Sequence, residues 1–387
     1  MNYLTIVRRI LRNLTTKRQK TYVSMSARWD NIRWFLRQGH VIAHIWDRIK
    51  WYGCPALFIT PRYPCHIELE ASAACQMKCP MCGQGKMYEQ GLKMGNMDFD
   101  LFKKIVDEVH RDVYSIKLSW RGEPSLNPHL HDMIRYAKLE RKMKSVAFLT
   151  NFERYDEAMV DDLLTTGVDY VSISFDGLGD TYERIRHPAK FDEVVKMIRY
   201  FVQQRDKLKL ERPVIRVQTI YSAIKDNYQE YVDLWDPIVD RVNFIADQYR
   251  VDHNENAYDL DPDYMCGVVF NRMAIGWDGK VTQCYSDYGE RTMVADVSKQ
   301  SVHSAWHSDG IKALRRSMME GTRLENHEPC RTCDHGAKGD TGEWITIKGR
   351  ELPVRIHAGK KIKPEEMNAK ENRWKKNRPP KPAGAAE

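Results

Sequence analysis

Apolar segments of strand length alternate with helical patterns through most of the chain, and this alternation restricts the fold more than any other feature. The strand-like segments fall at residues 65–70, 114–120, 145–150, 169–175, 213–220 and 240–246. Between them lie helical patterns at residues 98–110, 128–142, 155–166, 181–206 and 226–236. Such alternation predicts a parallel sheet with crossover helices. Ligand sites of these sheets lie at the carboxyl ends of the strands.

The pattern changes beyond about residue 247. Residues 268–284 predict a hairpin with Asp278-Gly279 as its turn, and residues 303–319 predict a helix. The Lys- and Pro-rich end predicts a disordered tail. We therefore expect four parts: a basic helical extension at 1–60, a barrel-like domain at 61–248, a smaller domain at 249–345 and a basic tail at 346–387.

The positive charge of the chain is concentrated at its two ends. Residues 1–50 hold 11 Lys and Arg against 2 acidic residues, and residues 359–387 hold 9 against 4, within a total net charge of +8. The middle is therefore net negative, and no nucleic-acid partner is expected. No apolar run is long enough to span a bilayer and no signal peptide is visible, which predicts a cytoplasmic protein. The basic, Trp-containing segment 1–50 either contacts a membrane surface or wraps the barrel with its basic face in solvent.

Three cysteines follow the first predicted strand in a C-x3-C-x2-C pattern: Cys75, Cys79 and Cys82. A structural zinc ion normally takes four protein ligands. Three cysteines on a [4Fe–4S] cluster leave one iron without a protein ligand. That iron is free to chelate the amino and carboxylate groups of a small molecule such as S-adenosylmethionine. Zinc binding or a purely structural role is the alternative.

This motif, placed after the first strand of a barrel, resembles the radical S-adenosylmethionine (SAM) superfamily. The resemblance implies a (β/α)6 partial TIM barrel whose [4Fe–4S] cluster reductively cleaves SAM. Arg121-Gly122-Glu123-Pro124 is similar to the family's Gly-Glu-Pro, which binds an amino group, although Arg121 replaces a frequent Gly. The resemblance also implies contacts to the rest of SAM at the strand ends, by Met81, Asn151, Ser174, Asp176, Arg186, Gln218 and Thr219. Each polar residue alone is equally typical of a helix cap or turn.

A second set of cysteines comprises Cys266, Cys284, Cys330 and Cys333. Its four thiols predict one fully ligated centre, and their spacing alone fits a structural zinc ion as well as a cluster. The pattern resembles the SPASM domain in its shortened form, twitch, because no cysteine follows Cys333. That resemblance implies a second, auxiliary [4Fe–4S] cluster. Cys54 and Cys65 remain, and we expect them to be buried apolar side chains.

The resemblance leads to a functional expectation. A fully ligated cluster has no open iron but still accepts electrons, and twitch-bearing members of the family include dehydrogenases of aminocyclitols. We expect oxidation of a sugar, cyclitol or other hydroxyl-bearing small molecule, with flavodoxin or ferredoxin as electron donor. The alternatives are a peptide maturase and a non-catalytic, metal-stabilised binding module. His66, Glu68 and Glu70 either face the barrel mouth or are packed and paired, and no general base can be named.

Overall fold

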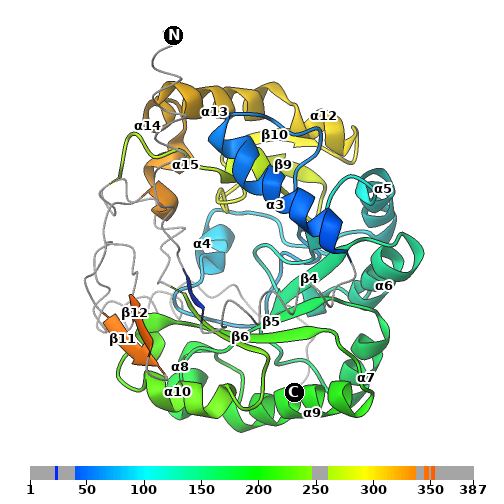
Figure 1. Ribbon diagram of the computed structural model, residues 1–387, viewed down its shortest axis with the longest axis vertical. Coiled ribbons are helices and arrows are strands. Elements are labelled where there is room, and N and C mark those ends of the chain that lie inside the picture. The colour runs from blue at the N-terminus through cyan, green and yellow to red at the C-terminus, as the bar shows by residue number, and fades with distance from the viewer. Residues whose placement is uncertain (1–21, 25–39, 246–259, 337–343, 348–349, 354–387) are drawn as a thin grey trace.

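The fold is built on a ten-stranded sheet, which a computed structural model describes together with its covering helices (Figure 1). The described residues are 22–24, 40–245, 260–336, 344–347 and 350–353. The strand order is β1-β7-β6-β5-β4-β3-β2-β8-β9-β10. The strands are β1 Tyr22–Ser24, β2 His66–Leu69, β3 Ser115–Lys117, β4 Ser145–Thr150, β5 Tyr170–Ser174, β6 Val214–Ile220, β7 Arg241–Ile245, β8 Arg272–Ile275, β9 Lys280–Thr282 and β10 Met293–Asp296.

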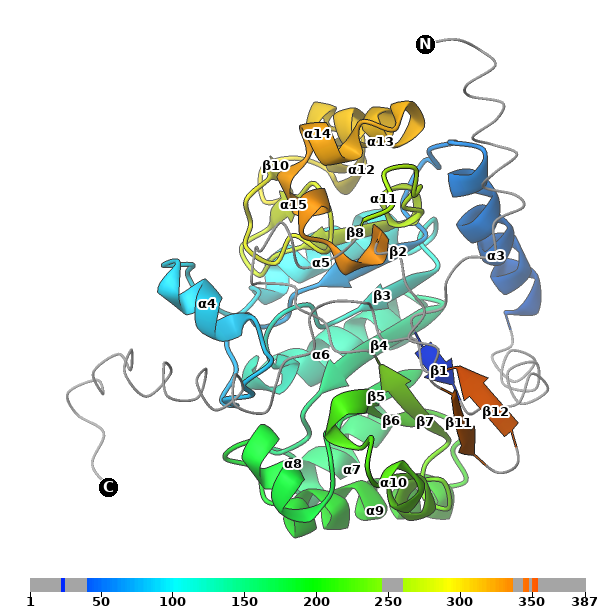
Figure 2. The ribbon, with the colours of Figure 1, turned by 90° about the vertical axis from the view of Figure 1, so that its left-hand side faces the viewer.

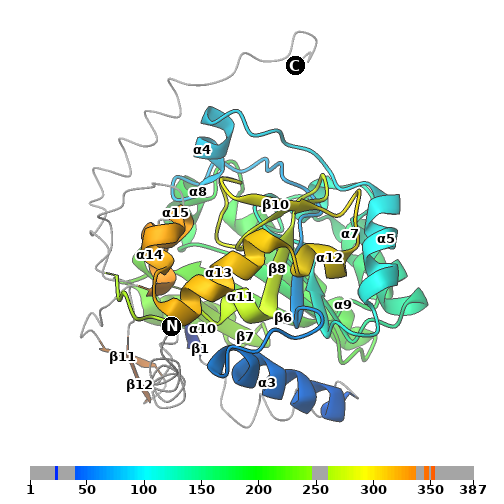
Figure 3. The same ribbon diagram turned by 90° about the horizontal axis from the view of Figure 1, so that it is seen from above.

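Neighbouring strands from β2 to β7 are all parallel, which confirms the α/β fold class. Helices connect them and cover the outer face of the curved sheet (Figures 1 and 3). They are α5 Phe99–Val109, α6 Leu130–Arg135, α7 Glu157–Thr165, α8 Gly179–Ile185, α9 Phe191–Lys207 and α10 Tyr228–Trp235. Helix α6 runs on into a π-helical turn at Tyr136–Glu140. All six strands of the predicted alternation are therefore present.

Helix α5 shows how the sequence sets these elements locally. The Asp98 carboxylate caps its first turn, because one oxygen accepts from the backbone N–H groups of Asp100 and Leu101 at 2.9 and 3.0 Å. Its apolar residues recur at helical spacing and are buried against the sheet, namely Phe102, Ile105, Val106 and Val109. Capping and periodicity agree, which explains why the helix lies where the pattern predicted it.

Two long helices predicted from the sequence are each divided. The predicted helix 181–206 is α8 and α9, separated by a segment that contains Pro188. Proline lacks a backbone N–H and disfavours helical backbone at the preceding residue, His187. The predicted helix 303–319 is α12 Val302–Trp306 and α13 Asp309–Glu320, with Ser308 in extended conformation between them. Both segments are helical, as predicted, but each consists of two helices and not of one.

The hairpin after the barrel extends the same sheet. Strand β8 pairs in parallel with β2, and β9 returns antiparallel to β8 around Gly279, whose φ is +85°. The hairpin begins later than predicted, because residues Val268–Asn271 form helix α11. The short helices α14 Arg323–Asn326 and α15 Glu328–Arg331 follow α13. Strands β8 to β10 belong to the same sheet as β2 to β7, and the domain boundary predicted at residue 248 remains a prediction.

The ends of the chain depart from the prediction in two places. Residues Tyr22–Ser24, expected to be helical, form β1 and pair antiparallel with β7. Residues 350–353, expected in a disordered tail, form β12 and pair with β11, Trp344–Ile347. Residues 346–347 of the predicted tail belong to β11, and residues 1–21, 25–39, 348–349 and 354–387 lie outside the described residues.

Helix α3, Val41–Ala56, confirms the predicted helical character of the later part of the extension. It covers the amino ends of the strands: His44 Nδ1 lies 3.2 Å from the hydroxyl of Tyr114, which precedes β3, and Asn271 donates to the Trp51 carbonyl at 3.2 Å just before β8. Helix α4, Gln84–Glu89, lies on the opposite side of the molecule (Figures 2 and 3). None of the helices in the described ranges combines the length and apolar character that a bilayer crossing requires.

Candidate active site at the carboxyl ends of the strands

A cavity of about 260 Å³ opens at the carboxyl ends of the parallel strands. Its wall contains all three cysteines of the first motif. The remaining lining comes mainly from the segments that follow β3 to β7, as expected for a parallel sheet. Eight of the residues predicted to contact SAM line it: Met81, Gly122, Glu123, Asn151, Ser174, Asp176, Arg186 and Gln218.

The cysteine loop is held by neighbouring backbone and side chains. The Cys82 N–H donates to the Cys79 carbonyl at 3.0 Å, which curls the loop around its thiols. Asn151 Nδ2 lies 3.8 Å from Cys75 Sγ, and Arg186 Nη1 lies 3.7 Å from Cys79 Sγ. Burial raises the pKa of Cys75 to about 12 and that of Cys79 to about 11. A bound metal centre supplies the positive charge that such buried thiols need in order to become thiolates, so the loop fits an iron–sulfur cluster.

The Gly-Glu-Pro loop packs directly on the chain that leads into Cys75. A Cβ on Gly122 would lie 2.4 Å from the Ser72 carbonyl oxygen and 2.5 Å from that of Ala74, so only glycine fits. The Glu123 N–H donates to the same Ala74 carbonyl at 2.7 Å. The backbone of this loop and the backbone before the cysteines therefore form one unit.

Glu123 is the buried acid of the cavity. Its carboxylate accepts from Thr150 Oγ1 and the Asn151 N–H, both at 2.7 Å, and from the Ser125 N–H at 3.1 Å. Burial nonetheless raises the pKa of Glu123. A carboxylate in this environment gains from a nearby ammonium group, which offsets the cost of its desolvation.

Asp176 binds and orients Arg186, a basic residue of the cavity wall. Its Nε donates to Asp176 Oδ2 at 2.7 Å, while Asp176 Oδ1 accepts from the Ile220 N–H at 2.7 Å. Burial alone would lower the pKa of Arg186, but Asp176 and the Cys79 thiol raise it, so the guanidinium stays charged. The cavity thus presents an acidic group on one wall and a basic group on another, as binding of an amino acid moiety requires.

Two predicted contacts lie outside the cavity lining. Thr219 is fully buried and its hydroxyl donates to the Ile220 carbonyl at 3.1 Å. Side chains alternate along a strand, so Gln218 facing the cavity turns Thr219 away from it. Pro124 begins a short 3₁₀ helix, Pro124–Leu126, and is buried there. Its part in the motif is to shape the loop.

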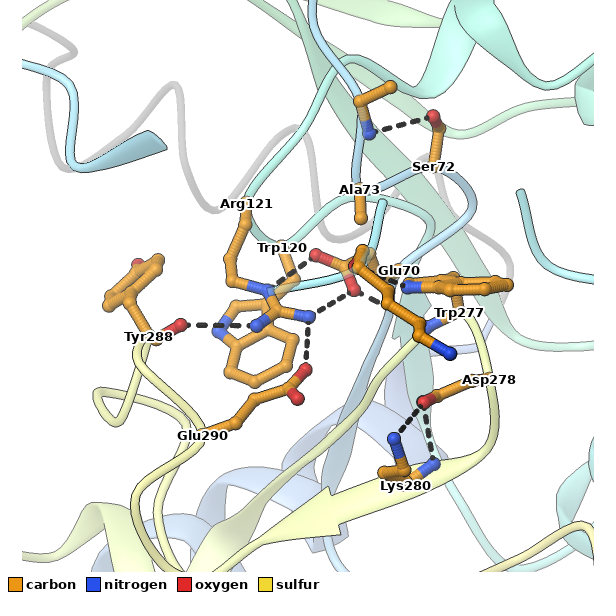
Figure 4. Close-up of polar contacts among 12 residues, drawn as sticks. Glu70, Ser72, Ala73, Trp120, Arg121, Trp277, Asp278, Lys280, Tyr288 and Glu290 are labelled. Atoms are coloured by element: carbon orange, nitrogen blue, oxygen red, sulfur yellow. Dashed lines mark hydrogen bonds and ion pairs between the residues drawn. The ribbon is translucent and has the colours of Figure 1, made fainter. Parts of the chain in front are cut away.

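Sequence reasoning missed Trp120, Arg121 and Tyr288, which also line the cavity. The Arg121 guanidinium lies over the Trp120 ring at 4.2 Å, and its Nη1 donates to the Tyr288 carbonyl at 3.1 Å (Figure 4). Its Nη2 also forms an ion pair with Glu290 at 2.6 Å. The departure from the family's Gly at position 121 was the available signal. No signal in the sequence indicated Tyr288, because it lies more than 160 residues after Arg121 along the chain.

The acidic residues of β2 prove to be packed and paired. Both Glu70 oxygens accept from Arg121 at 2.6 Å. Glu68 forms ion pairs with Lys117 at 3.2 Å and with Arg272 at 3.3 Å. His66 bonds Ser115 at 2.7 Å, and burial lowers its pKa to about 3. These contacts stabilise the barrel interior and leave none of the three as a free acid or base at the cavity.

The second cysteine set gathers beside α11 and α13. Cys266 is buried with Val269, Phe270, Leu314 and Met318, and Cys284 and Cys330 pack against this cluster. Burial raises the pKa values of Cys266 and Cys284, and that of Cys330 to about 11. Cys333 follows just beyond α15. Within the described residues, no three His, Cys, Asp or Glu side chains converge closely enough for a single metal ion.

The segment after Cys284 connects the two cysteine sets. The Trp120 indole N–H donates to the Tyr285 carbonyl at 2.7 Å, and the rings of Trp120 and Tyr288 lie 5.9 Å apart. Tyr285 is the residue next to Cys284. A direct hydrogen-bonded path therefore runs from the cavity wall to the second set.

Such a site, three cysteines beside a buried acid and base at the mouth of a partial barrel, defines an iron–sulfur enzyme. Residues 69–244 match the model of the radical SAM superfamily, and residues 266–334 match that of the SPASM iron–sulfur cluster-binding domain. The chain belongs to the radical SAM superfamily and carries a C-terminal SPASM-type domain. Its cofactors are SAM, a SAM-binding [4Fe–4S] cluster and an auxiliary cluster.

Curated relatives and solved structures agree with this assignment. The chain is 24% identical over 262 residues to a tungsten-containing aldehyde ferredoxin oxidoreductase cofactor-modifying protein of Pyrococcus furiosus, covering 57% of this chain and 70% of the relative. It is 24% identical over 70 residues to a SAM-dependent 2-deoxy-scyllo-inosamine dehydrogenase of Niallia circulans, covering 18% and 28%. The structure resembles that of anSMEcpe with bound AdoMet, with a TM-score of 0.52, 14% identity and coverage of 71% and 91%.

Proposed function

We propose that this radical SAM enzyme dehydrogenates a hydroxyl-bearing small molecule such as a sugar or cyclitol, with the auxiliary cluster as electron acceptor. The observation that carries the proposal is the bond between the Trp120 indole and the Tyr285 carbonyl, which joins the cavity wall to the residue beside Cys284. A substrate in the cavity would thus lie within the fold next to the second cysteine set.

Residue roles follow from the cavity. Cys75, Cys79 and Cys82 would hold the first cluster, and Cys266, Cys284, Cys330 and Cys333 the second. Glu123 would accept hydrogen bonds from the amino group of SAM, and Arg186 would bind its carboxylate. The other polar lining residues would bind its ribose and adenine, with Met81 beside the ring: Asn151, Ser174, Asp176 and Gln218. Gly122 keeps the acid-bearing loop close to the cysteine loop.

When bound, the first cluster supplies the electron that splits SAM into methionine and a 5′-deoxyadenosyl radical. The chain's own residues position the partners: the buried walls keep the radical from water, and Trp120 and Tyr288 close the side facing the auxiliary domain. The alcohol carbon loses a hydrogen atom to the radical, and the remaining substrate radical loses one electron and one proton. With one electron taken from the first cluster and one passed to the auxiliary cluster, one alcohol and one SAM would give one carbonyl compound, 5′-deoxyadenosine, methionine and one proton.

The lining favours a neutral hydroxylated substrate. Among the lining residues not assigned to SAM, Ser119 and Thr150 carry hydroxyl groups and Gln84 carries an amide. Groups of this type both donate to and accept from alcohols. The guanidinium of Arg121, which also lines the cavity, is already paired with Glu70 and Glu290. A flavodoxin or ferredoxin would supply the electron for the first cluster.

Anaerobic assay of the reconstituted enzyme tests the proposal. Sugars, cyclitols and peptides are offered separately, and 5′-deoxyadenosine and substrate products are measured. We expect substrate-dependent 5′-deoxyadenosine with equimolar carbonyl product from an alcohol. Turnover of peptides alone would reject the small-molecule assignment and favour peptide maturation. The structure also resembles that of anSMEcpe with bound AdoMet and the Cp18Cys peptide, with a TM-score of 0.51.

A further inference from the structure

Helix α3 presents an apolar stripe to solvent. Ile42, Ile45, Trp46 and Ile49 are 85, 54, 60 and 54% exposed. Their spacing of three or four residues places them on one face of the helix. Monomeric soluble proteins rarely leave such a contiguous face uncovered, and scattered exposure of single residues does not produce this periodicity.

The face that α3 turns toward the protein is the more polar one. Asp47 is 1% exposed and forms an ion pair with Arg48, and His44 bonds Tyr114. The helix also packs against α11. The contact between His44 and Tyr114 and the packing on α11 orient α3, and a rotation that buried the apolar stripe would break them. The Asp47–Arg48 pair lies within the helix and does not orient it.

The stripe continues past the end of the helix. Leu57 and Ile59 are 46 and 51% exposed, and Pro55 and Ala56 anchor the turn between helix and strand by their burial. The exposed surface therefore spans α3 and the residues after it.

The excess of basic residues in the N-terminal part of the chain indicates what binds to this surface. Residues 1–50 carry 11 Lys and Arg against Asp30 and Asp47, and the described part of this segment includes Arg48 and Lys50 within the stripe's own helix. Trp and Tyr, each with an apolar ring and a polar group, favour the boundary between lipid and water. Anionic lipid attracts the cations while the aliphatic side chains enter the acyl boundary.

We propose that the exposed face of α3, extended by Leu57 and Ile59, docks on the surface of an anionic membrane. Because α3 covers the amino ends of the strands, the bilayer lies on the side opposite the cysteine cavity and α4 (Figures 2 and 3). The cavity then stays open to a soluble substrate and to the electron donor. The membrane is an anchoring surface in this arrangement and does not deliver a lipid-linked substrate through that face.

Vesicle co-sedimentation of the full-length, cluster-loaded enzyme tests the proposal. We expect binding to vesicles that contain phosphatidylglycerol, weaker binding to phosphatidylcholine alone, and loss of binding at high salt. The double variant Ile45→Ser/Ile49→Ser should bind on the order of tenfold or more weakly, because each serine removes most of an aliphatic side chain from the contact. Met293→Ser, an exposed apolar residue on β10, is the matched control and should bind as wild type.

The remaining outcomes also decide the matter. SAM cleavage without vesicles should be equal in all three proteins, since the stripe lies away from the cavity. Equal vesicle binding by the double variant and wild type, or no binding by wild type at low salt, would overturn the proposal. A wild-type dimer in sedimentation velocity that the double variant abolishes would assign the stripe to a second copy of the chain and reject the membrane.

Discussion

Arg121 and Glu70 form a bidentate ion pair, in which Nε and Nη2 of the arginine each lie 2.6 Å from a different carboxylate oxygen. The side chain of Arg121 is 2% exposed and that of Glu70 is fully buried. Arg121 belongs to the Gly-Glu-Pro loop and Glu70 directly follows β2. Glu290, the other partner of Arg121, lies in the SPASM-type domain. The pair therefore fixes three segments around the cavity (Figure 4).

Replacing Arg121 alone should destabilise the enzyme more than replacing Arg121 and Glu70 together. Arg121→Met leaves the Glu70 carboxylate buried without its partner, at an expected cost of about 3–5 kcal/mol. Adding Glu70→Gln removes that charge and should restore part of the loss. Denaturant unfolding of both variants and of Glu70→Gln alone measures this. A double variant whose loss equals the sum of the single losses would show that the two side chains do not interact.

Gly122→Ala should disrupt the cysteine loop. The new methyl group would meet backbone atoms of Ser72, Ala73 and Ala74 at 2.4 to 2.5 Å, and backbone has little room to move. We expect reduced incorporation of the first cluster and loss of SAM binding, measured by iron content and equilibrium dialysis. Gly53→Ala is the control, because nothing lies within 4 Å of its added Cβ. Normal iron content in Gly122→Ala would contradict the close packing.

Glu123 should make SAM binding depend on pH. Burial raises the pKa of its carboxyl above the ordinary value, and the ionised form binds an ammonium group. Affinity should therefore fall as the pH is lowered through the raised pKa of Glu123, since protonation removes the negative charge that accepts hydrogen bonds from the amino group of SAM. Glu123→Gln should bind SAM about 10- to 100-fold more weakly, from the loss of a charged hydrogen bond, with a flatter profile. An unchanged profile in the variant would assign the pH dependence to another group.

The sequence was sufficient to predict the barrel, the cysteine loop and the acid and base of the cavity, because these depend on local patterns and motifs. Strand periodicity gave each strand within a few residues, and the resemblance of the motifs to the radical SAM superfamily gave eight lining positions. Thr219 was misplaced since the pattern did not show which side of β6 faces the cavity. Tyr288 and the pairing of Glu70 with Arg121 depend on contacts between distant segments, which periodicity does not encode. The apolar stripe of α3 could be recognised from its helical spacing. Whether the stripe faces the protein or the solvent depends on which face of α3 packs on the barrel, and the spacing does not show this.

The two cysteine sets should be separable by their iron. The wild-type enzyme should contain about eight irons, as two four-iron clusters require. A Cys75/Cys79/Cys82→Ala variant should retain about four and lose SAM cleavage. A Cys266/Cys284→Ala variant should also retain about four, still cleave SAM slowly to 5′-deoxyadenosine, and fail to form oxidised product, because its electron acceptor is absent. Anaerobic iron and sulfide analysis with Mössbauer spectroscopy measures the clusters, and product analysis measures the coupling. Full alcohol oxidation by the second variant would remove the auxiliary cluster from the proposed electron path, whereas one zinc with about four irons in wild type would make the second set structural.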